Sequence, residues 1–128
     1  MKFDAIVFDL DGTITRSAPG IMGSAKYALS ELGKPIPGES VLLRFVGPPL
    51  RDSFRELCGL NEDETEKAVA LFRKRHNAVG WKEACVYPGI FELLYSLKKA
   101  GCHVALASSK SLALCEKTLE YFGLRRFF

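Results

Sequence analysis

Two carboxylates placed two residues apart, Asp9 and Asp11, are the residues of this chain whose types and spacing most directly suggest chemistry. They follow an apolar run, residues 5–8, that predicts a short strand buried on both faces. Carboxylates this close repel one another unless a cation lies between them or one of them carries a proton. Gly12 lets the backbone turn sharply around a small anion, and Thr13 adds a hydroxyl that can fix a neighbouring carboxylate. The stretch therefore predicts a site for metal-assisted phosphoryl chemistry.

An acidic loop of the calcium-binding type is the alternative interpretation of this stretch. Such loops place acids at successive alternate positions and end on a glutamate. Here Thr13, not a third acid, follows Asp11 at the next alternate position, and no terminal glutamate is present. The calcium-loop interpretation is therefore the weaker of the two.

A second apolar run, residues 103–107, predicts another buried parallel strand, and it ends at Ser108, Ser109 and Lys110. Ligands of parallel sheets bind beyond the carboxyl ends of the strands, so these hydroxyls should lie opposite the acidic pair. A phosphate could then sit between the two strand ends. Ser108 and Ser109 also precede a predicted helix, whose free N–H groups attract anions. Simple helix capping is the alternative role for both serines.

Helical periodicity fills most of the chain between the two strands. Helices are expected from Pro19 to Gly33, from Glu39 to Val46, from Leu50 to Cys58, and from Asn61 to about His76 or beyond. Two later helices should bury the stripes Ile90, Leu93, Leu94 and Leu97, and Leu112, Cys115, Leu119 and Phe122. The helical insertion is too long for a simple connection. We expect a helical cap domain, residues 17–84, that interrupts an α/β core made of residues 1–16 and 85–128.

The stretch Asp9-Leu10-Asp11-Gly12-Thr13 resembles the first motif of the haloacid dehalogenase-like superfamily, mostly phosphatases with an aspartate nucleophile. The resemblance implies an α/β fold with a parallel, Rossmann-like core and an inserted α-helical cap. Residues 86–89 (VYPG) and 107–110 (ASSK) look like the phosphoglycolate phosphatase and β-phosphoglucomutase branch. Residues 45–50 (FVGPPL) look like the cap loop of phosphoglycolate phosphatase-like members, which reaches over the active site.

The resemblance also implies roles for individual residues. Asp9 would attack the phosphate ester and form an aspartyl-phosphate, and Asp11 would protonate the leaving alcohol and later activate water. Mg²⁺ would be held at Asp9 and Asp11, by the carboxylate of the first and the backbone carbonyl of the second. Contacts to the substrate or its phosphate are expected from Leu10, Thr13, Arg44, Gly47, Ser108, Ser109 and Lys110. Arg44 and Lys110 could hold an anionic substrate tail or be plain surface cations.

Composition excludes several classes of function. The chain has 128 residues and a net charge of +3, with scattered basic residues, so a nucleic-acid partner is not expected. No apolar run reaches membrane-spanning length and the N-terminus leads straight into a strand, so we expect neither a membrane partner nor a signal peptide. The four cysteines lack metal-site spacing and suit free thiols in a reducing cytoplasm. The expected partner is a small phosphorylated metabolite.

The chain also departs from the family pattern. The third motif, a lysine that neutralises the phosphate, and the fourth, an acidic pair that completes the metal site, have no convincing counterpart in this sequence. We therefore expect the chain to be the N-terminal portion of such an enzyme, with an open sheet edge through which it could self-associate. Arg16 also stands where relatives commonly have aspartate, which affects the cap hinge.

The sequence therefore predicts a magnesium-dependent phosphomonoester hydrolase of the phosphoglycolate phosphatase-like type. A β-phosphoglucomutase-like phosphotransferase using the same aspartate is one alternative, and a catalytically deficient, truncated relative is another. A receiver-type signalling domain also carries aspartates on a parallel sheet, but it would lack the large helical insertion after the first strand.

Overall fold

The computed structural model describes residues 2–128, and the chain in it divides into two compact units. The α/β unit comprises the segment that ends at Arg16 together with Cys85–Phe128, and the helical unit comprises Ser17–Ala84. Each unit has a hydrophobic core of its own. No helix in the described part of the chain combines the length and apolar character that crossing a membrane requires.

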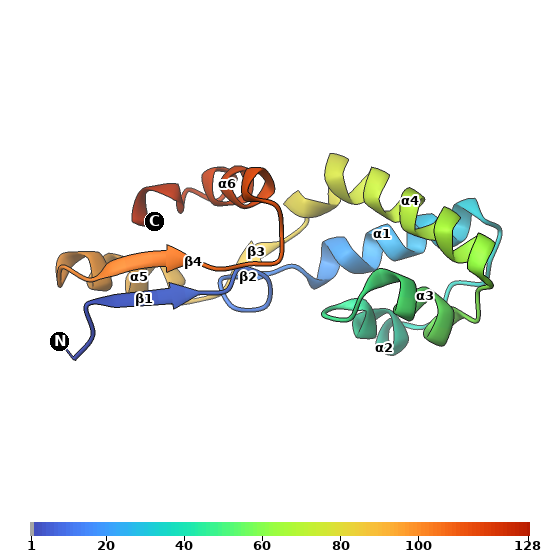
Figure 1. Ribbon diagram of the computed structural model, residues 1–128, viewed down its shortest axis with the longest axis horizontal. Helices are drawn as coiled ribbons and strands as arrows, with labels where there is room; N and C mark the ends of the chain where they lie inside the picture. The colour runs from blue at the N-terminus through green and yellow to red at the C-terminus, as the bar shows by residue number, and fades with distance from the viewer. Residues whose placement is uncertain (1) are drawn as a thin grey trace. The chain divides into compact units, whose positions relative to one another are not determined.

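Two parallel strands form the centre of the α/β unit (Figure 1). Strand β1 (Ala5–Phe8) pairs with strand β4 (His103–Leu106), with Ala5 opposite His103 and Phe8 opposite Leu106. Helix α5 (Ile90–Lys99) precedes β4, and helix α6 (Leu112–Tyr121) and a 3₁₀ turn, η3 (Arg125–Phe127), follow it. The α/β class with a parallel sheet, predicted from the sequence, is confirmed.

Only one face of this sheet is covered. Ile6, Phe8, Val104 and Leu106 pack with buried residues of α5 and α6, so both helices cover the same face. Because successive strand residues point to opposite faces, Val7 lies on the other face, and its side chain is 63% exposed. The prediction of strands buried on both faces was wrong, because it assumed helices on each side of the sheet.

Two predicted helix stripes were too wide. Helix α5 buries Ile90, Leu94 and Leu97, whereas Leu93 is 44% exposed. Helix α6 buries Cys115 and Leu119, whereas Leu112, its first residue, is 75% exposed.

A small antiparallel ladder, which the sequence did not predict, lies where the chain leaves and re-enters the α/β unit. Strand β2 (Thr15–Arg16) pairs with strand β3 (Cys85–Val86), and the Tyr87 N–H donates to the Ile14 carbonyl at 3.0 Å. Strands of two residues are too short to show an alternating pattern in the sequence. The ladder ties both connections of the helical insertion to the turn that carries the carboxylates.

The helical unit contains α1 (Ala18–Glu31), α2 (Glu39–Leu42), α3 (Leu50–Cys58) and α4 (Glu62–Ala78), with 3₁₀ turns η1 (Leu43–Phe45) and η2 (Gly80–Lys82). Three phenylalanines form its centre: the rings of Phe45 and Phe54 meet edge to face at 5.0 Å, and those of Phe54 and Phe72 at 6.4 Å. Asn61 caps α4 in a capping box, because it accepts the Glu64 N–H at 2.8 Å while Glu64 accepts the Asn61 N–H at 3.1 Å. This capping box fixes the start of α4.

A polar cluster ties the ends of the helical unit together. The Arg75 guanidinium donates to both carboxylate oxygens of Glu83, at 2.7 and 3.0 Å, and to the Ser24 hydroxyl at 3.1 Å. His76 stacks on Phe72, and its Nδ1 lies 3.3 Å from the Ser24 hydroxyl oxygen, so its contacts are structural. A side chain at Gly80 would collide with His76 and Ser24, which explains why the chain has glycine there.

Candidate active site

The carboxylates stand on a turn that is wound around a single carbonyl group. The Leu10 carbonyl accepts the N–H groups of Thr13, Ile14 and Thr15 at 3.3, 3.0 and 3.1 Å, and the Gly12 N–H donates to Thr15 O at 2.8 Å. Gly12 has φ +82°, a conformation that other residues resist. Leu10 and Ile14 are fully buried and anchor the turn in the core, so the turn is held on both its polar and its apolar sides.

Asp9 is the first residue beyond β1, and its side chain is exposed. Its Oδ1 accepts the Leu10 N–H at 2.8 Å, which orients the carboxylate. No hydrogen bond from another described residue reaches Oδ2. One oxygen of Asp9 is therefore held by the backbone while the other can meet a substrate or a cation.

Asp11 is paired with Lys110, and this pair is the main charge contact of the site. The Lys110 Nζ lies 3.0 Å from Asp11 Oδ1, with 17% of the lysine side chain and 31% of the aspartate side chain exposed. Oδ1 is buried and accepts no properly aligned hydrogen bond from the described residues, so the contact is a close ion pair whose angles are not those of a hydrogen bond. The strand end after β4 thus supplies a cation to the turn after β1.

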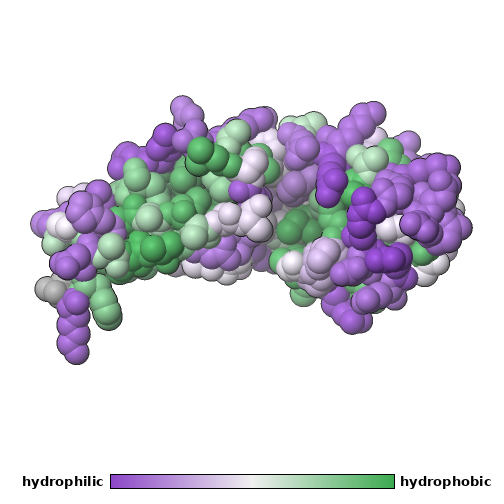
Figure 2. Space-filling model, in the orientation of Figure 1, coloured by the Kyte–Doolittle hydropathy of each residue, from purple (hydrophilic) through white to green (hydrophobic). Residues whose placement is uncertain are grey.

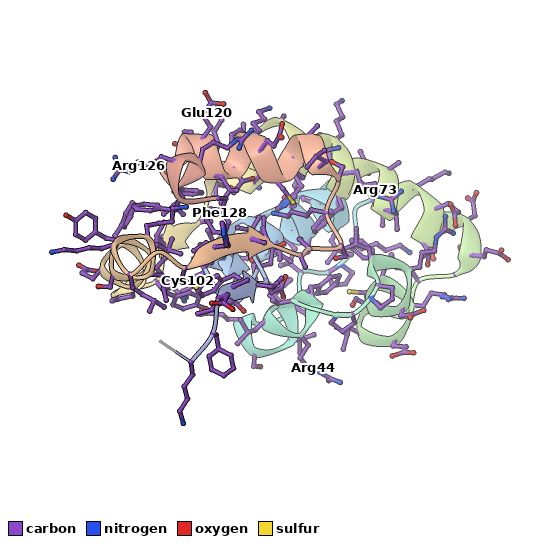
Figure 3. The ribbon with its side chains drawn as sticks, turned by 60° about the vertical axis from the view of Figure 1, so that its left-hand side comes forward. Arg44, Arg73, Cys102, Glu120, Arg126 and Phe128 are labelled. Atoms are coloured by element: carbon purple, nitrogen blue, oxygen red, sulfur yellow. The ribbon has the colours of Figure 1, made fainter. Side chains whose placement is uncertain are left out.

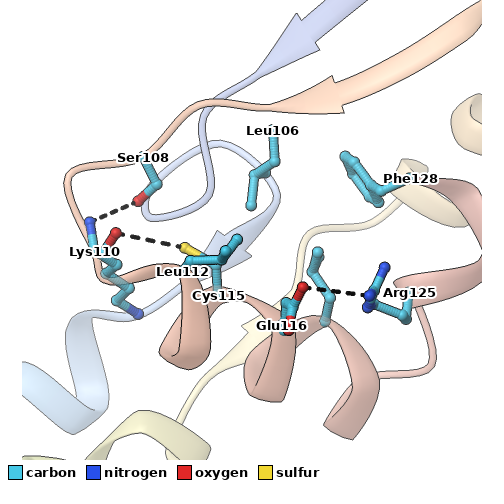
Figure 4. Close-up of a pocket in the computed structure, with 9 residues that line it drawn as sticks. Leu106, Ser108, Lys110, Leu112, Cys115, Glu116, Arg125 and Phe128 are labelled. Atoms are coloured by element: carbon cyan, nitrogen blue, oxygen red, sulfur yellow. Dashed lines mark hydrogen bonds and ion pairs between the residues drawn. The ribbon is translucent and has the colours of Figure 1, made fainter.

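The residues after β4 form a tight turn before α6. The Lys110 N–H donates to the Ser108 hydroxyl at 3.2 Å (Figure 4). The Leu114 N–H donates to the Ser111 hydroxyl at 3.2 Å. Ser111, and neither Ser108 nor Ser109, is therefore the cap of α6. Ser108 and Ser109 therefore do not cap this helix. The Ser108 hydroxyl instead accepts the hydrogen bond from the Lys110 N–H within the turn.

A cavity of about 270 Å³ adjoins this turn, between β4, α6 and η3 (Figure 4). Its walls are formed by Leu106, Ser108, Lys110, Leu112, Cys115, Glu116, Leu119, Arg125 and Phe128. The Arg125 guanidinium pairs with Glu116 at 3.3 Å on one side of it. Sequence reasoning missed these two residues because they are nine positions apart on different elements, a spacing that gives no periodic signal.

The remaining predicted residues are placed as follows. The Thr13 hydroxyl makes no hydrogen bond with the described residues, and its contribution to the turn comes from its backbone N–H. Arg44 lies on η1 with an exposed side chain (Figure 3), and Gly47 follows in the loop before α3 with φ +114°. Both belong to the helical unit, so the geometry described for the α/β unit does not include them.

The donor set of this turn suits a magnesium ion. Among the described residues no three His, Cys, Asp or Glu side chains converge as a closed metal cage. Magnesium prefers hard oxygen ligands, usually one or two carboxylates with several waters and a substrate phosphate. The unengaged Oδ2 of Asp9 and the Asp11 carbonyl, to which no backbone N–H of the described residues donates, match that requirement.

Of the four cysteines, only Cys115 is among the residues that line the cavity beside this turn. All are free thiols, as predicted, with Cys102 and Cys115 buried. Burial raises the pKa of the Cys58 thiol above its ordinary value, which keeps it protonated and weakly nucleophilic. A cysteine-based mechanism therefore has no support among the described residues.

Comparison with known proteins places this arrangement in context. The sequence model of a family described as haloacid dehalogenase-like hydrolase matches residues 6–128. A tyrosine-protein kinase, PtkA, of Mycobacterium tuberculosis is 37% identical over 123 residues, covering 96% of this chain and 42% of the relative. A 5'-nucleotidase of Pseudomonas aeruginosa is 35% identical over 128 residues, covering 100% of this chain and 58% of the relative.

Solved structures show the same likeness. A haloacid dehalogenase-like family hydrolase from Streptococcus pneumoniae superposes with a TM-score of 0.90 at 32% identity, covering 98% of this chain and 59% of that chain. Proteins named phosphoglycolate phosphatase are also among the matches. The chain spans about half the length of the curated relatives it matches.

Proposed function

Because the chain belongs to the haloacid dehalogenase-like hydrolase family, we propose that it carries the nucleophile of a magnesium-dependent phosphomonoester hydrolase. The observation that supports this most strongly is the adjacency of two strand ends. Phe8 and Leu106 are paired, and the Ala107 N–H donates to the Phe8 carbonyl at 2.8 Å. Asp9 follows Phe8 and Ser108 follows Ala107, so the proposed nucleophile and the proposed phosphate-binding hydroxyl come from the ends of two adjacent strands.

Asp9 is the proposed nucleophile. Its free oxygen attacks phosphorus, the bond from phosphorus to the ester oxygen breaks, and an aspartyl-phosphate forms. Asp11 gives its proton to the departing alcohol oxygen. In the second half of the reaction Asp11 takes a proton from water, whose oxygen attacks phosphorus and releases Asp9 and inorganic phosphate.

Bound Mg²⁺ would supply positive charge that offsets the repulsion between the substrate phosphate and the Asp9 carboxylate. The residues proposed to hold it are Asp9, through its side chain, and Asp11, through its carbonyl oxygen. Ser108 and Ser109 hold the phosphate from the opposite strand end. Thr13, which is exposed on the turn, is proposed to contact the same group.

The helical unit is the proposed cap. Cap loops of this kind exclude water and select the substrate. Residues 46–49 form the loop between η1 and α3, within the 45–50 stretch singled out from the sequence, and Arg44 on η1 is exposed beside it. We assign Arg44 and Gly47 to recognition of the part of a small phosphorylated metabolite that lies beyond its phosphate. The relatives named phosphoglycolate phosphatase suggest that this metabolite is small and acidic.

Phosphoryl transfer to an acceptor other than water is the second candidate function. It is favoured by the similarity to a protein named tyrosine-protein kinase, and it would use the same aspartate, as in a β-phosphoglucomutase-like reaction. The two candidates differ in the fate of the phosphoryl group. Release of inorganic phosphate without added acceptor supports hydrolysis, whereas turnover that requires a tyrosine peptide or a sugar phosphate supports transfer.

Hydrolysis of p-nitrophenyl phosphate by the intact protein, with and without magnesium, tests the proposal. The Asp9→Asn variant should lose turnover by at least about a thousandfold while its circular dichroism spectrum stays unchanged, since asparagine keeps the shape but not the nucleophile. The exposed Asp4→Asn variant, on the same unit, is the matched control and should keep full activity. Retention of most activity in Asp9→Asn would rule out an Asp9 nucleophile, and a wild type without activity would rule out the hydrolase.

A further inference from the structure

Lys110 is more than a surface cation, because its ammonium group is paired with one carboxylate, that of Asp11. Its backbone N–H is fixed by the Ser108 hydroxyl at 3.2 Å, so the residue is anchored at the base of the turn. Its ammonium lies 3.0 Å from Asp11 Oδ1 and is largely withdrawn from solvent, with 17% of the side chain exposed. A lysine held at both ends has little freedom to follow a substrate.

The Asp11 oxygen in this pair, Oδ1, makes no hydrogen bond with the described residues. Oδ1 of Asp11 is buried and receives no aligned hydrogen bond from the described residues. The ammonium is the charged group that faces it. With Oδ1 held in this way, Oδ2 is the oxygen of Asp11 that can carry and deliver a proton.

We infer that Lys110 is a positioning residue that orients Asp11 for proton transfer to the leaving group, and not a ligand of the substrate phosphate. This inference rests on the proposed hydrolase function. In the first step the ester oxygen leaves phosphorus and takes the proton from Asp11 Oδ2, while Asp9 forms the new bond to phosphorus. Lys110 keeps Asp11 in the rotamer from which that proton is delivered, and it exchanges no proton itself.

The leaving group separates this role from phosphate binding. A nitrophenolate leaves readily without a proton, whereas an alkoxide requires one from a general acid. Loss of a residue that acts through Asp11 therefore slows alkyl phosphates much more than aryl phosphates. Loss of a phosphate ligand slows both to the same degree. The ratio kcat/KM is the quantity to compare, because it reports the transfer to Asp9 and not the later hydrolysis.

The experiment measures kcat/KM of the intact protein for glycerol 2-phosphate and p-nitrophenyl phosphate. Lys110→Met should lower the value about 10- to 100-fold for glycerol 2-phosphate, part of the 10²–10⁴ that general acid–base catalysis contributes, and less than about threefold for p-nitrophenyl phosphate. Lys110→Arg should recover part of the loss. Lys98→Met, an exposed lysine at the end of α5, is the matched control and should leave both values unchanged.

Non-additivity gives the second criterion. If Lys110 acts through Asp11, the double variant Lys110→Met with Asp11→Asn should be no slower on glycerol 2-phosphate than Asp11→Asn alone. Equal losses on the two substrates, an additive double variant, or an unaffected Lys110→Met would each overturn the inference.

A readout without substrate keeps this test separate from that of the hydrolase. The ¹⁵N NMR signal of the Lys110 ammonium should be protected from rapid exchange in the wild type and lose that protection in Asp11→Asn. If the Lys110 ammonium is protected but the protein has no phosphatase activity, the proposed function is ruled out, whereas the Lys110–Asp11 pair is supported. An unprotected ammonium in the wild type would remove the positioning role even if the enzyme is active.

Discussion

The two units of this chain bury their apolar residues in different ways. The helical unit surrounds its core on every side: Leu42, Phe45, Phe54 and Leu29 are all at most 2% exposed. Near the C-terminal end of α4, Arg75 is paired with Glu83, and at its N-terminal end the capping box binds the Glu64 N–H. All of these contacts form within residues 17–84.

The α/β unit covers its sheet on one face only. Neither outer edge of the β1–β4 pair has a partner strand among the described residues, and Val7 is exposed on the open face. Apolar side chains gather over the region of β1 and β4 in the space-filling view (Figure 2). Parallel sheets are normally buried on both faces, so this unit offers surface for further chain or for a second molecule.

Close packing and the candidate chemistry are found in different units of the chain. The helical unit is complete in its packing but carries no acidic pair on a strand end. The α/β unit carries Asp9, Asp11 and Lys110 on turns beyond its strands, while its sheet is only half covered. The candidate site thus depends on two strand ends whose positions are set by a sheet with open edges.

The largest expected effect comes from the closed core. Phe54→Ala should lower the free energy of unfolding of the helical unit by about 3–5 kcal/mol, since the ring is fully buried between two other phenylalanines. Leu43→Ala, at a side chain 51% exposed in the same unit, should change it by less than about 0.5 kcal/mol. Urea unfolding followed by circular dichroism measures both, and equal losses would show that this core is not closed.

A smaller effect is expected at the open face. We propose that the 128-residue chain self-associates through the uncovered sheet, and Val7→Lys should weaken that association about tenfold, or ~1.4 kcal/mol, by placing a charge on the face. Tyr95→Lys is the control, because its side chain is also 63% exposed but lies on α5. Sedimentation velocity over a concentration series gives the dissociation constants. A wild type that stays monomeric at high concentration would contradict the open-face description.

The smallest effect concerns the first turn of α4. The Lys34 ammonium, and then the Asn61 backbone N–H, lower the pKa of Glu64 below its ordinary value. Glu64 thus contributes stability that is present above the ordinary glutamate pKa and is lost as pH falls through the lowered pKa. Glu64→Gln should therefore flatten the acid side of the stability curve relative to the wild type. Unfolding midpoints measured between about pH 3 and pH 6 decide between a flattened and an unaltered curve.

Much of the fold could be predicted because local signals agree with it. The apolar runs before Asp9 and Ser108 became the paired strands, and the glycine that follows α3, Gly59, takes the left-handed conformation with φ +65° that ends a helix. The capping box at Asn61 is equally local. The open face of the sheet was not predictable, because an apolar strand has the same sequence whether or not a second layer covers it.

The strand ends and the turn that carry the candidate site residues could be predicted, but the contacts between these residues could not. Asp9, Asp11 and Ser108 follow from strand ends and a turn motif, which are sequence features. The pairing of Lys110 with Asp11 depends on how a long side chain crosses between two turns that are 99 positions apart, and no periodicity records that. Ser111 as the cap of α6 was missed because Ser108 and Ser109 offer the same hydroxyl three and two residues earlier, respectively.

Trapping of the covalent intermediate tests the central claim, the Asp9 nucleophile, most directly. In the Asp11→Asn variant, hydrolysis of the intermediate lacks its base, so an aspartyl-phosphate should accumulate during turnover of p-nitrophenyl phosphate with magnesium. Acid quenching and peptide mass spectrometry should then find the phosphoryl group on the peptide that contains Asp9, and on Asp9 itself. A phosphoryl group on Ser108 or Ser109, or none on Asp9 while nitrophenol is still released, would contradict the account.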